Sequence, residues 1–82
     1  MHRRYLHINI PTEIVRTIVV ISETGSFSKA GEKLGLSQPA ISAQVKRLQI
    51  LVGGNIFEKV TGGVSLTPKG KLVLSQARKW RR

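Results

Sequence analysis

The stretch LSQPAISAQVKRL, residues 36–48, carries hydrogen-bonding and cationic side chains spaced four residues apart. Gln38, Ser42 and Lys46 would share one side of a helix, because side chains at i and i+4 lie one above the other. Amide and hydroxyl groups donate and accept hydrogen bonds, and an ammonium group adds positive charge. This combination suits an anionic partner that offers edges for hydrogen bonding. A separate, buried side is predicted from apolar residues at i, i+4 and i+7, namely Ile41, Val45 and Leu48.

The net charge of the chain indicates the same kind of partner. Fourteen Lys and Arg residues face four acidic residues, all of them Glu, which gives a formal net charge of +10. Solubility alone usually requires a magnitude of roughly 2–8 in a small domain. A polyanion is therefore the expected partner, and nucleic acid is the commonest polyanion for so basic a chain.

Length and composition predict one small domain. At 82 residues with 40% hydrophobic content, the chain is near the size at which a single core becomes marginal. It contains no cysteine, which excludes disulfides and thiolate metal sites and is typical of cytoplasmic proteins. The apolar run at 14–21 is too short to span a bilayer and lacks the pattern of a signal peptide. We therefore expect a soluble, cytoplasmic domain without a membrane partner.

The sequence offers almost no groups for catalysis or metal binding. It contains neither Asp nor Cys, and its two histidines, His2 and His7, lie near the N-terminus. No spacing among its residues matches a metal site or a catalytic triad. We therefore expect neither an enzyme nor a site for a metal or cofactor.

Two helices are predicted N-terminal to the stretch at residues 36–48. The first spans about 12–23, where apolar residues recur at helical spacing. The second is shorter; Ser26 or Ser28 can cap its first turn, and Gly35 is placed for a left-handed stop. Only three residues then separate it from the next helix, which is typical of a helix-turn-helix. Gly31 lies inside the second helix, where it would allow the two helices to approach closely.

The remainder of the chain predicts a third helix, a hairpin and a fourth helix. The third begins at Ser37 as its cap and runs to about Val52. Two β-prone pieces, 56–60 and 64–66, follow and are joined by Thr61-Gly62-Gly63, a hairpin turn. A hairpin directly after a helix-turn-helix is a wing. Thr67 and Pro68 then open a fourth helix as cap and first residue.

The predicted fold is therefore mainly α, a winged helix-turn-helix with three helices, a two-stranded wing and a C-terminal linker helix. An N-terminal arm at 1–11 does not follow the core pattern. The winged helix-turn-helix would occupy 12–66. The linker helix would occupy 67–82 and be truncated by the end of the chain.

The helix at 37–52 would be a recognition helix, which enters the major groove of DNA with its N-terminal residues against base edges. Gln38 can form two hydrogen bonds with adenine, and Ser42 can bond either base type. Pro39 and Ala40 can contact thymine methyl groups. The remaining predicted contacts, mainly to phosphates or an adjacent minor groove, come from Ser28, Lys29, Ser37, Lys46, Arg47, Lys59, Thr61 and Gly62.

Three stretches of the chain resemble the N-terminal DNA-binding domain of the LysR-type transcriptional regulators. They are ETGSFSKAGEKLGLSQPAISAQVKRL, GGNIFEKVTGGVSLTPKG and the start of the last helix, and the resemblance covers about residues 12–80. The resemblance implies base and phosphate contacts near Ser37, Gln38, Pro39 and Ser42. It also implies pairing of two linker helices in a two-fold dimer. The implied dimer seam comprises Leu72, Val73, Ala77 and Trp80.

Several positions depart from the pattern of this family. Ala43 stands where a basic residue is frequent, Gln49 replaces a usual Glu, and Gly31 replaces a usual Ala. Lys59 stands where the wing usually carries Arg, so the planar guanidinium fork is missing. Family members also continue into a two-lobed effector-binding domain, whereas this chain ends at Arg82. We therefore expect a fragment or truncated regulator without a small-molecule effector site.

The function expected from the sequence is specific binding of double-stranded DNA by a bacterial regulator domain, as a two-fold dimer. Two alternatives stay open. One is a winged helix whose basic surface docks an acidic protein. The other is non-specific cationic adhesion to nucleic acid or to an anionic membrane.

Overall fold

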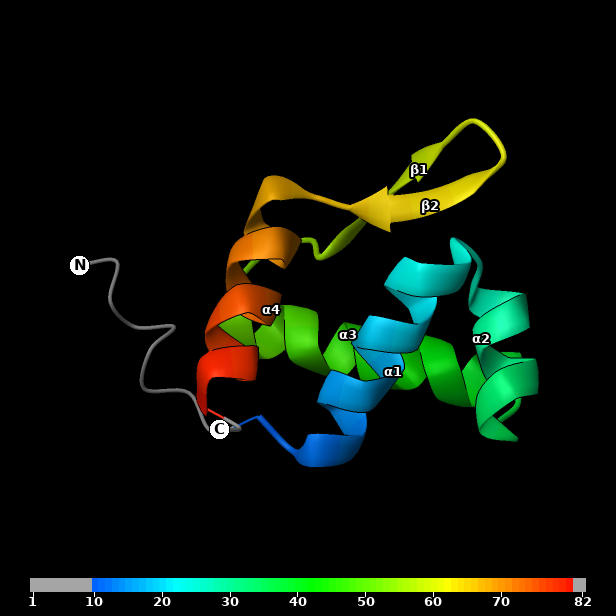
Figure 1. The fold of residues 1–82 in the computed structure, drawn as a ribbon, viewed down its shortest axis with the longest axis horizontal. Coiled ribbons are helices and arrows are strands. Elements are labelled where there is room, and N and C mark those ends of the chain that lie inside the picture. The colour runs from blue at the N-terminus through cyan, green and yellow to red at the C-terminus, as the bar shows by residue number, and fades with distance from the viewer. Residues whose placement is uncertain (1–9, 81–82) are drawn as a thin grey trace.

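The computed structural model describes the backbone of residues 10–80 and the side chains of residues 10–77. In this part of the chain, α3 runs behind α1, and a hairpin extends from the start of α4 over the connection between α1 and α2 (Figure 1). In chain order the elements are α1 (Thr12–Thr24), α2 (Phe27–Leu34), α3 (Gln38–Val52), β1 (Phe57–Val60), β2 (Gly63–Leu66) and α4 (Pro68–Trp80). The predicted winged helix-turn-helix is confirmed.

The ends of the helices are set by caps that the sequence predicts. Of the two serines that can cap α2, Ser26 does so, since its Oγ accepts a hydrogen bond from the Lys29 N–H at 3.0 Å. Ser37 caps α3 by accepting from the Ala40 N–H at 3.2 Å. Thr67 caps α4 by accepting from the Gly70 N–H at 2.9 Å.

The turn between α2 and α3 depends on the small size of Gly31. The Gly31 carbonyl accepts a hydrogen bond from the Leu36 N–H at 2.9 Å, which closes the turn. A Cβ atom at Gly31 would lie 2.6 Å from the Leu36 carbonyl oxygen, well inside ordinary contact distance. The same Cβ atom would lie 3.6 Å from Ile41 Cγ1 on α3, so the glycine lets α2 approach the turn closely and places it in contact with α3.

The wing is a two-stranded antiparallel sheet in which Phe57 pairs with Leu66 and Val60 pairs with Gly63. Its turn is thus shorter than predicted, because Gly63 belongs to the ladder and only residues 61–62 form the loop. Val64 donates a backbone hydrogen bond to the Gly25 carbonyl at 3.0 Å. A Cβ atom at Gly63 would collide with the same carbonyl oxygen, so this strand approaches the end of α1 only because Gly63 has no side chain.

The hydrophobic core lies between α1, α2, α3 and α4. Each fully buried aliphatic side chain there contributes on the order of 1.5–3 kcal/mol. The buried apolar residues are Ile14, Val15, Ile18, Ile21, Ala30, Ile41, Val45, Leu48, Val52, Ile56, Val73, Leu74 and Ala77. Ile10 also packs against this core, although the sequence placed it in an arm outside the core pattern. The rest of the predicted arm, residues 1–9 with both histidines, lies outside the described residues.

Polar bonds connect α3 to its neighbours at three points along its length. Near the middle, the buried Thr17 hydroxyl on α1 contacts Gln44 Oε1 at 2.5 Å. Five residues later, Gln49 Oε1 accepts from the backbone N–H of Ile56, just before β1, at 3.1 Å. At the end of α3, the Lys69 ammonium group donates to the Val52 carbonyl at 3.4 Å. A cation at a helix C-terminus interacts favourably with the helix dipole.

None of the helices among residues 10–80 is long and apolar enough to cross a membrane.

We expect that Gln49→Ala destabilises the wing and lowers the free energy of unfolding. The Ile56 residue is fully buried, so the substitution leaves its backbone N–H without the acceptor it now uses. An unsatisfied buried donor costs about 1–3 kcal/mol. Urea denaturation measures this loss, and hydrogen exchange of the Ile56 amide reports whether it is local.

Two further variants serve as controls. Gln49→Glu keeps an acceptor oxygen and should retain most of the Ile56 protection. Gln38→Ala removes an exposed glutamine from the same helix. Its free energy of unfolding should stay within about 0.5 kcal/mol of that of the original protein. Equal unfolding free energies and equal amide protection in Gln49→Ala and Gln38→Ala would show that the bond does not hold the wing.

Candidate nucleic-acid interface

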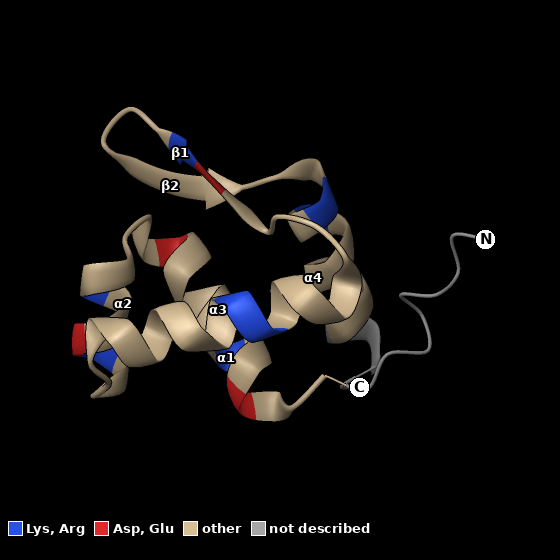
Figure 2. Cartoon of the chain, turned by 180° about the vertical axis from the view of Figure 1, so that it is seen from behind, with Lys and Arg blue, Asp and Glu red and all other residues tan. Residues whose placement is uncertain are grey.

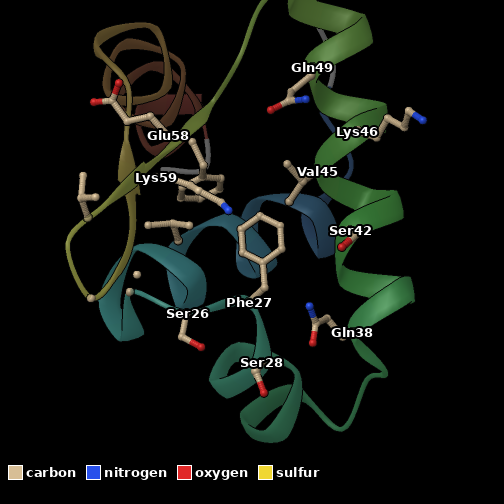
Figure 3. Close-up of a pocket in the computed structure, with 16 residues that line it drawn as sticks. Ser26, Phe27, Ser28, Gln38, Ser42, Val45, Lys46, Gln49, Glu58 and Lys59 are labelled. Carbon is tan, nitrogen blue, oxygen red and sulfur yellow. The ribbon is translucent and has the colours of Figure 1, made fainter.

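A long open groove runs between α3 on one side and the wing on the other, with the start of α2 at one end (Figure 3). Its volume is about 830 Å³. The groove exists because the Gly25–Val64 bond holds β2 over the α1–α2 connection while the core holds α3 opposite.

The floor of the groove is apolar. The rings of Phe27 on α2 and Phe57 on β1 meet edge to face, with centroids 5.7 Å apart and an interplanar angle of 76°. Such a pair contributes about 0.5–1.5 kcal/mol beyond the area it buries. Val45 of α3 lines the same groove beside the Phe27 ring. The sequence pattern placed Val45 in the buried stripe of α3 and assigned neither phenylalanine to the site.

The walls of the groove carry polar groups from both sides. Gln38, Ser42 and Gln49 project from α3 toward the wing, and the Lys59 ammonium group reaches in from β1 (Figure 3). The Glu58 carboxylate points away from this space, since successive side chains of a strand alternate between its faces. The groove therefore combines hydrogen-bonding groups with one inward cation.

The outward face of α3 is exposed along its whole length. Pro39, Ala43, Lys46, Arg47 and Ile50 all lie on the side opposite the buried stripe and are solvent-exposed. Ile50, near the C-terminal end, is 75% exposed. Lys46 points out of the groove (Figure 3), so it belongs to this outward face together with Arg47.

The start of α2 lies at the end of the groove. Its first amides lack acceptors within the helix, as at any helix N-terminus. Ser28 and Lys29 are exposed there, and Ser28 lines the groove. Amide donors, a hydroxyl and an ammonium group at a helix N-terminus favour binding of an anion such as phosphate.

The structure gathers the predicted contact residues on one side of the molecule. The recognition-helix residues, the start of α2 and the wing all border the groove or the outward face of α3. Thr61 and Gly62 form the exposed tip of the wing, Ser37 is exposed at its cap position, and Ala40 is half-buried. Figure 2 shows basic positions on α2, α3 and β1 and acidic positions on α1, α2 and β1.

Three members of the predicted dimer seam have described side chains, and they occupy different environments. Val73 and Ala77 are 4% and 3% exposed and pack into the core of the chain itself. Leu72, at 46% exposed, is the described member that remains open to a second copy. The side chain of Trp80, the last residue of α4, lies outside the described residues.

Among residues 10–77, no group of three His, Asp or Glu side chains is placed to hold a metal ion.

Comparison with known proteins assigns this arrangement to a family. The family described as "bacterial regulatory helix-turn-helix protein, lysR family" matches residues 13–71. The HTH-type transcriptional activator AllS of Klebsiella pneumoniae is 46% identical over 68 residues, which are 83% of this chain and 25% of AllS. AllS of Salmonella typhi is 43% identical over the same number of residues. The chain thus spans about a quarter of the length of the curated relatives it matches first.

Solved structures of similar fold include complexes with DNA. Vibrio fischeri DarR in complex with DNA has a TM-score of 0.79 and 29% identity, covering 89% of this chain and 25% of DarR. The complex of the BenM DNA-binding domain with catB site 1 DNA has a TM-score of 0.75 and 30% identity. It covers 89% of this chain and 79% of that one. The chain therefore belongs to the LysR family of bacterial helix-turn-helix regulators and has the winged-helix fold of its DNA-binding domain.

Proposed function

We propose that this domain binds double-stranded DNA specifically, with the N-terminal half of α3 in the major groove and the wing on the flanking backbone or minor groove. The observation that carries this proposal is the joint position of Gln38 and Ser42 on α3, opposite Lys59 on the wing. Base-reading groups and a backbone-binding cation face each other across one groove. In the proposed complex, the backbone of one DNA strand lies between α3 and the wing.

The side chains divide into readers and anchors. Gln38 and Ser42 offer hydrogen bonds to base edges, and Pro39 and Ala40 offer apolar contact to thymine methyl groups. Lys46 and Arg47 lie further along the exposed face of α3, where phosphate contacts position a protein without carrying sequence information. Ser28 and Lys29, at the N-terminus of α2, suit a neighbouring phosphate.

We further propose that two copies bind as a two-fold dimer through the exposed side of α4. Leu72 lies on that side. Val73 and Ala77 lie on the opposite side and stabilise α4 by packing into the core. In such a dimer, two recognition helices enter successive major grooves about 34 Å apart. The proposed role in the cell is regulation of transcription, since the relatives it matches first bear the name HTH-type transcriptional activator. The proposed location is the bacterial cytoplasm.

The first test is a titration into two labelled duplexes, an interrupted palindrome chosen by randomised-duplex selection and its scramble, at several salt concentrations. Clear preference for the palindrome, with two copies bound per duplex, is the expected result. If the domain binds both duplexes equally and binding is lost at high salt concentration, the domain is a non-specific cationic binder. If the domain binds neither duplex, the alternative of an acidic protein partner is favoured.

We expect Gln38→Ala to relax base preference at one position of each half-site. A bidentate contact discriminates against the wrong base by about 1–3 kcal/mol, and the substitution removes it without altering charge. Competition titrations with duplexes that vary one base pair at a time measure the change. An unchanged preference at every position would mean that Gln38 does not read a base.

We expect Lys46→Gln to weaken binding to all sequences alike. Each phosphate neutralised by a lysine contributes about 0.9 to the slope of log affinity against log salt concentration, so the slope should fall by about 1 per copy. Arg16→Gln is the matched control, because Arg16 is exposed on α1 and does not line the groove. Equal salt slopes for the two variants would contradict a phosphate contact at Lys46.

A further inference from the structure

The end of α3 and the start of α4 meet at a junction formed by residues 52–56 and 67–70. The Thr67 hydroxyl donates a hydrogen bond to the Asn55 carbonyl at 2.7 Å, and the Thr67 N–H donates to the Ile56 carbonyl at 2.9 Å. A Cβ atom at Gly70 would collide with the same Ile56 oxygen. The first turn of α4 therefore lies directly against the chain that leaves α3.

Lys69 extends this junction to α3 itself. Its ammonium group donates to the Val52 carbonyl at 3.4 Å and to the Gly53 carbonyl at 3.3 Å. The last carbonyl groups of a helix have no donor within the helix, and the helix dipole favours a cation beside them. The Lys69 stem passes close to Gly54, where a Cβ atom would lie 2.8 Å from Lys69 Cδ. One side chain of α4 thus closes the C-terminal end of the recognition helix.

These bonds fix a direction that apolar packing alone leaves adjustable. Val73 and Ala77 bury one side of α4 in the core, but hydrophobic burial is non-directional. Hydrogen bonds depend on both distance and angle. The donors at Lys69 and Thr67 therefore restrict the angle at which α4 leaves the end of α3.

We propose that Lys69 is a positioning residue that fixes the angle between α3 and α4 and so sets the half-site spacing that the dimer accepts. This role rests on the proposed dimeric binding of DNA, in which two α4 helices pair and each carries its own α3.

The length of α3 amplifies any change of this angle. The helix has 15 residues, which span about 22 Å. Lys69 holds its C-terminal end, whereas Gln38 lies at the opposite end. A rotation of about 10° at the junction would therefore move Gln38 by about 4 Å. Neighbouring base pairs are about 3.4 Å apart, so this small rotation displaces a recognition helix by a whole base-pair step.

The first experiment measures the arrangement of the two helices in the domain alone, at a concentration at which it is monomeric. The chain contains no cysteine, so Ala43→Cys and Ser75→Cys place spin labels at one exposed site on α3 and one on α4. Adding Lys69→Met keeps an apolar stem and removes the ammonium group. This change should broaden the distribution of distances between the labels by about 4 Å. Lys69→Arg keeps a cation with donors and should restore most of the original width.

Arg16→Met is the matched control, since it removes one cation from an exposed position on α1, outside the junction. It should leave the width of the distance distribution unchanged. Circular dichroism and urea denaturation of each labelled variant verify that the domain remains folded, because unfolding would broaden the distances for a different reason.

The second experiment uses the palindrome obtained by randomised selection, with one base pair inserted or removed between its half-sites. The change moves one recognition helix off its site, so the original domain should bind at least about tenfold more weakly, as for a mismatched base pair. In Lys69→Met this penalty should fall severalfold, because the released helix can follow the shifted half-site. Both proteins should bind a single half-site equally. A loss of stability alone would weaken binding to every duplex alike and leave the ratio between duplexes unchanged.

The outcomes separate this role from the proposed function. Equal label distances in Lys69→Met and Arg16→Met would show that Lys69 does not hold the two helices and would overturn the proposal. Broader distances with an unchanged spacing penalty would overturn the role in half-site spacing. If one copy binds per duplex, or if the palindrome is not preferred over its scramble, the proposed function itself fails and the spacing role fails with it. The label distances then still decide whether Lys69 holds α4 against α3.

Discussion

Ile41, Val45 and Leu48 are exposed by no more than 4%, and the surface that covers them belongs to the helices packed against α3. An isolated helix of fifteen residues is marginal in water, so this burial is the main reason that α3 forms. Rotating α3 about its axis would expose the stripe to water, which fixes the direction of every other residue on the helix. The face proposed to bind DNA is thus determined by the face that packs on the core.

The wing depends on α3 and α1 in turn, because a two-stranded hairpin is not stable alone. It is anchored at both strands, by the bond from Ile56 to Gln49 before β1 and by the bond from Val64 to Gly25 within β2. Contact between the Phe27 and Phe57 rings adds an apolar link across the groove floor. These links belong to different elements, and together they set the width of the groove between wing and recognition helix.

Most of the fold could be predicted from the sequence, because local signals decide it. Caps at Ser37 and Thr67, and the helical spacing of apolar residues, gave the helix bounds to within one or two residues. The packing of Ile10 against the core depends on contacts distant in the sequence, which no local pattern encodes. Val73 and Ala77 show the same limit, since an apolar stripe on α4 has the same spacing whether its partner is α1 or a second copy.

The candidate site was predictable residue by residue but not as a surface. Gln38 and Lys59 were named from their chemistry, whereas the groove that joins them required the three-dimensional path of the wing. The small size of the residues on the outer side of the first turns of α3 fits the proposed insertion of this helix into the major groove. A helix is about 10–12 Å across with its side chains, and the major groove is about 12 Å wide. Pro39, Ala40, Ser42 and Ala43 are short, so the helix can come close enough for Gln38 to reach a base edge. Long cationic side chains begin only at Lys46, where in the proposed complex the helix leaves the bases and phosphates are the nearest groups.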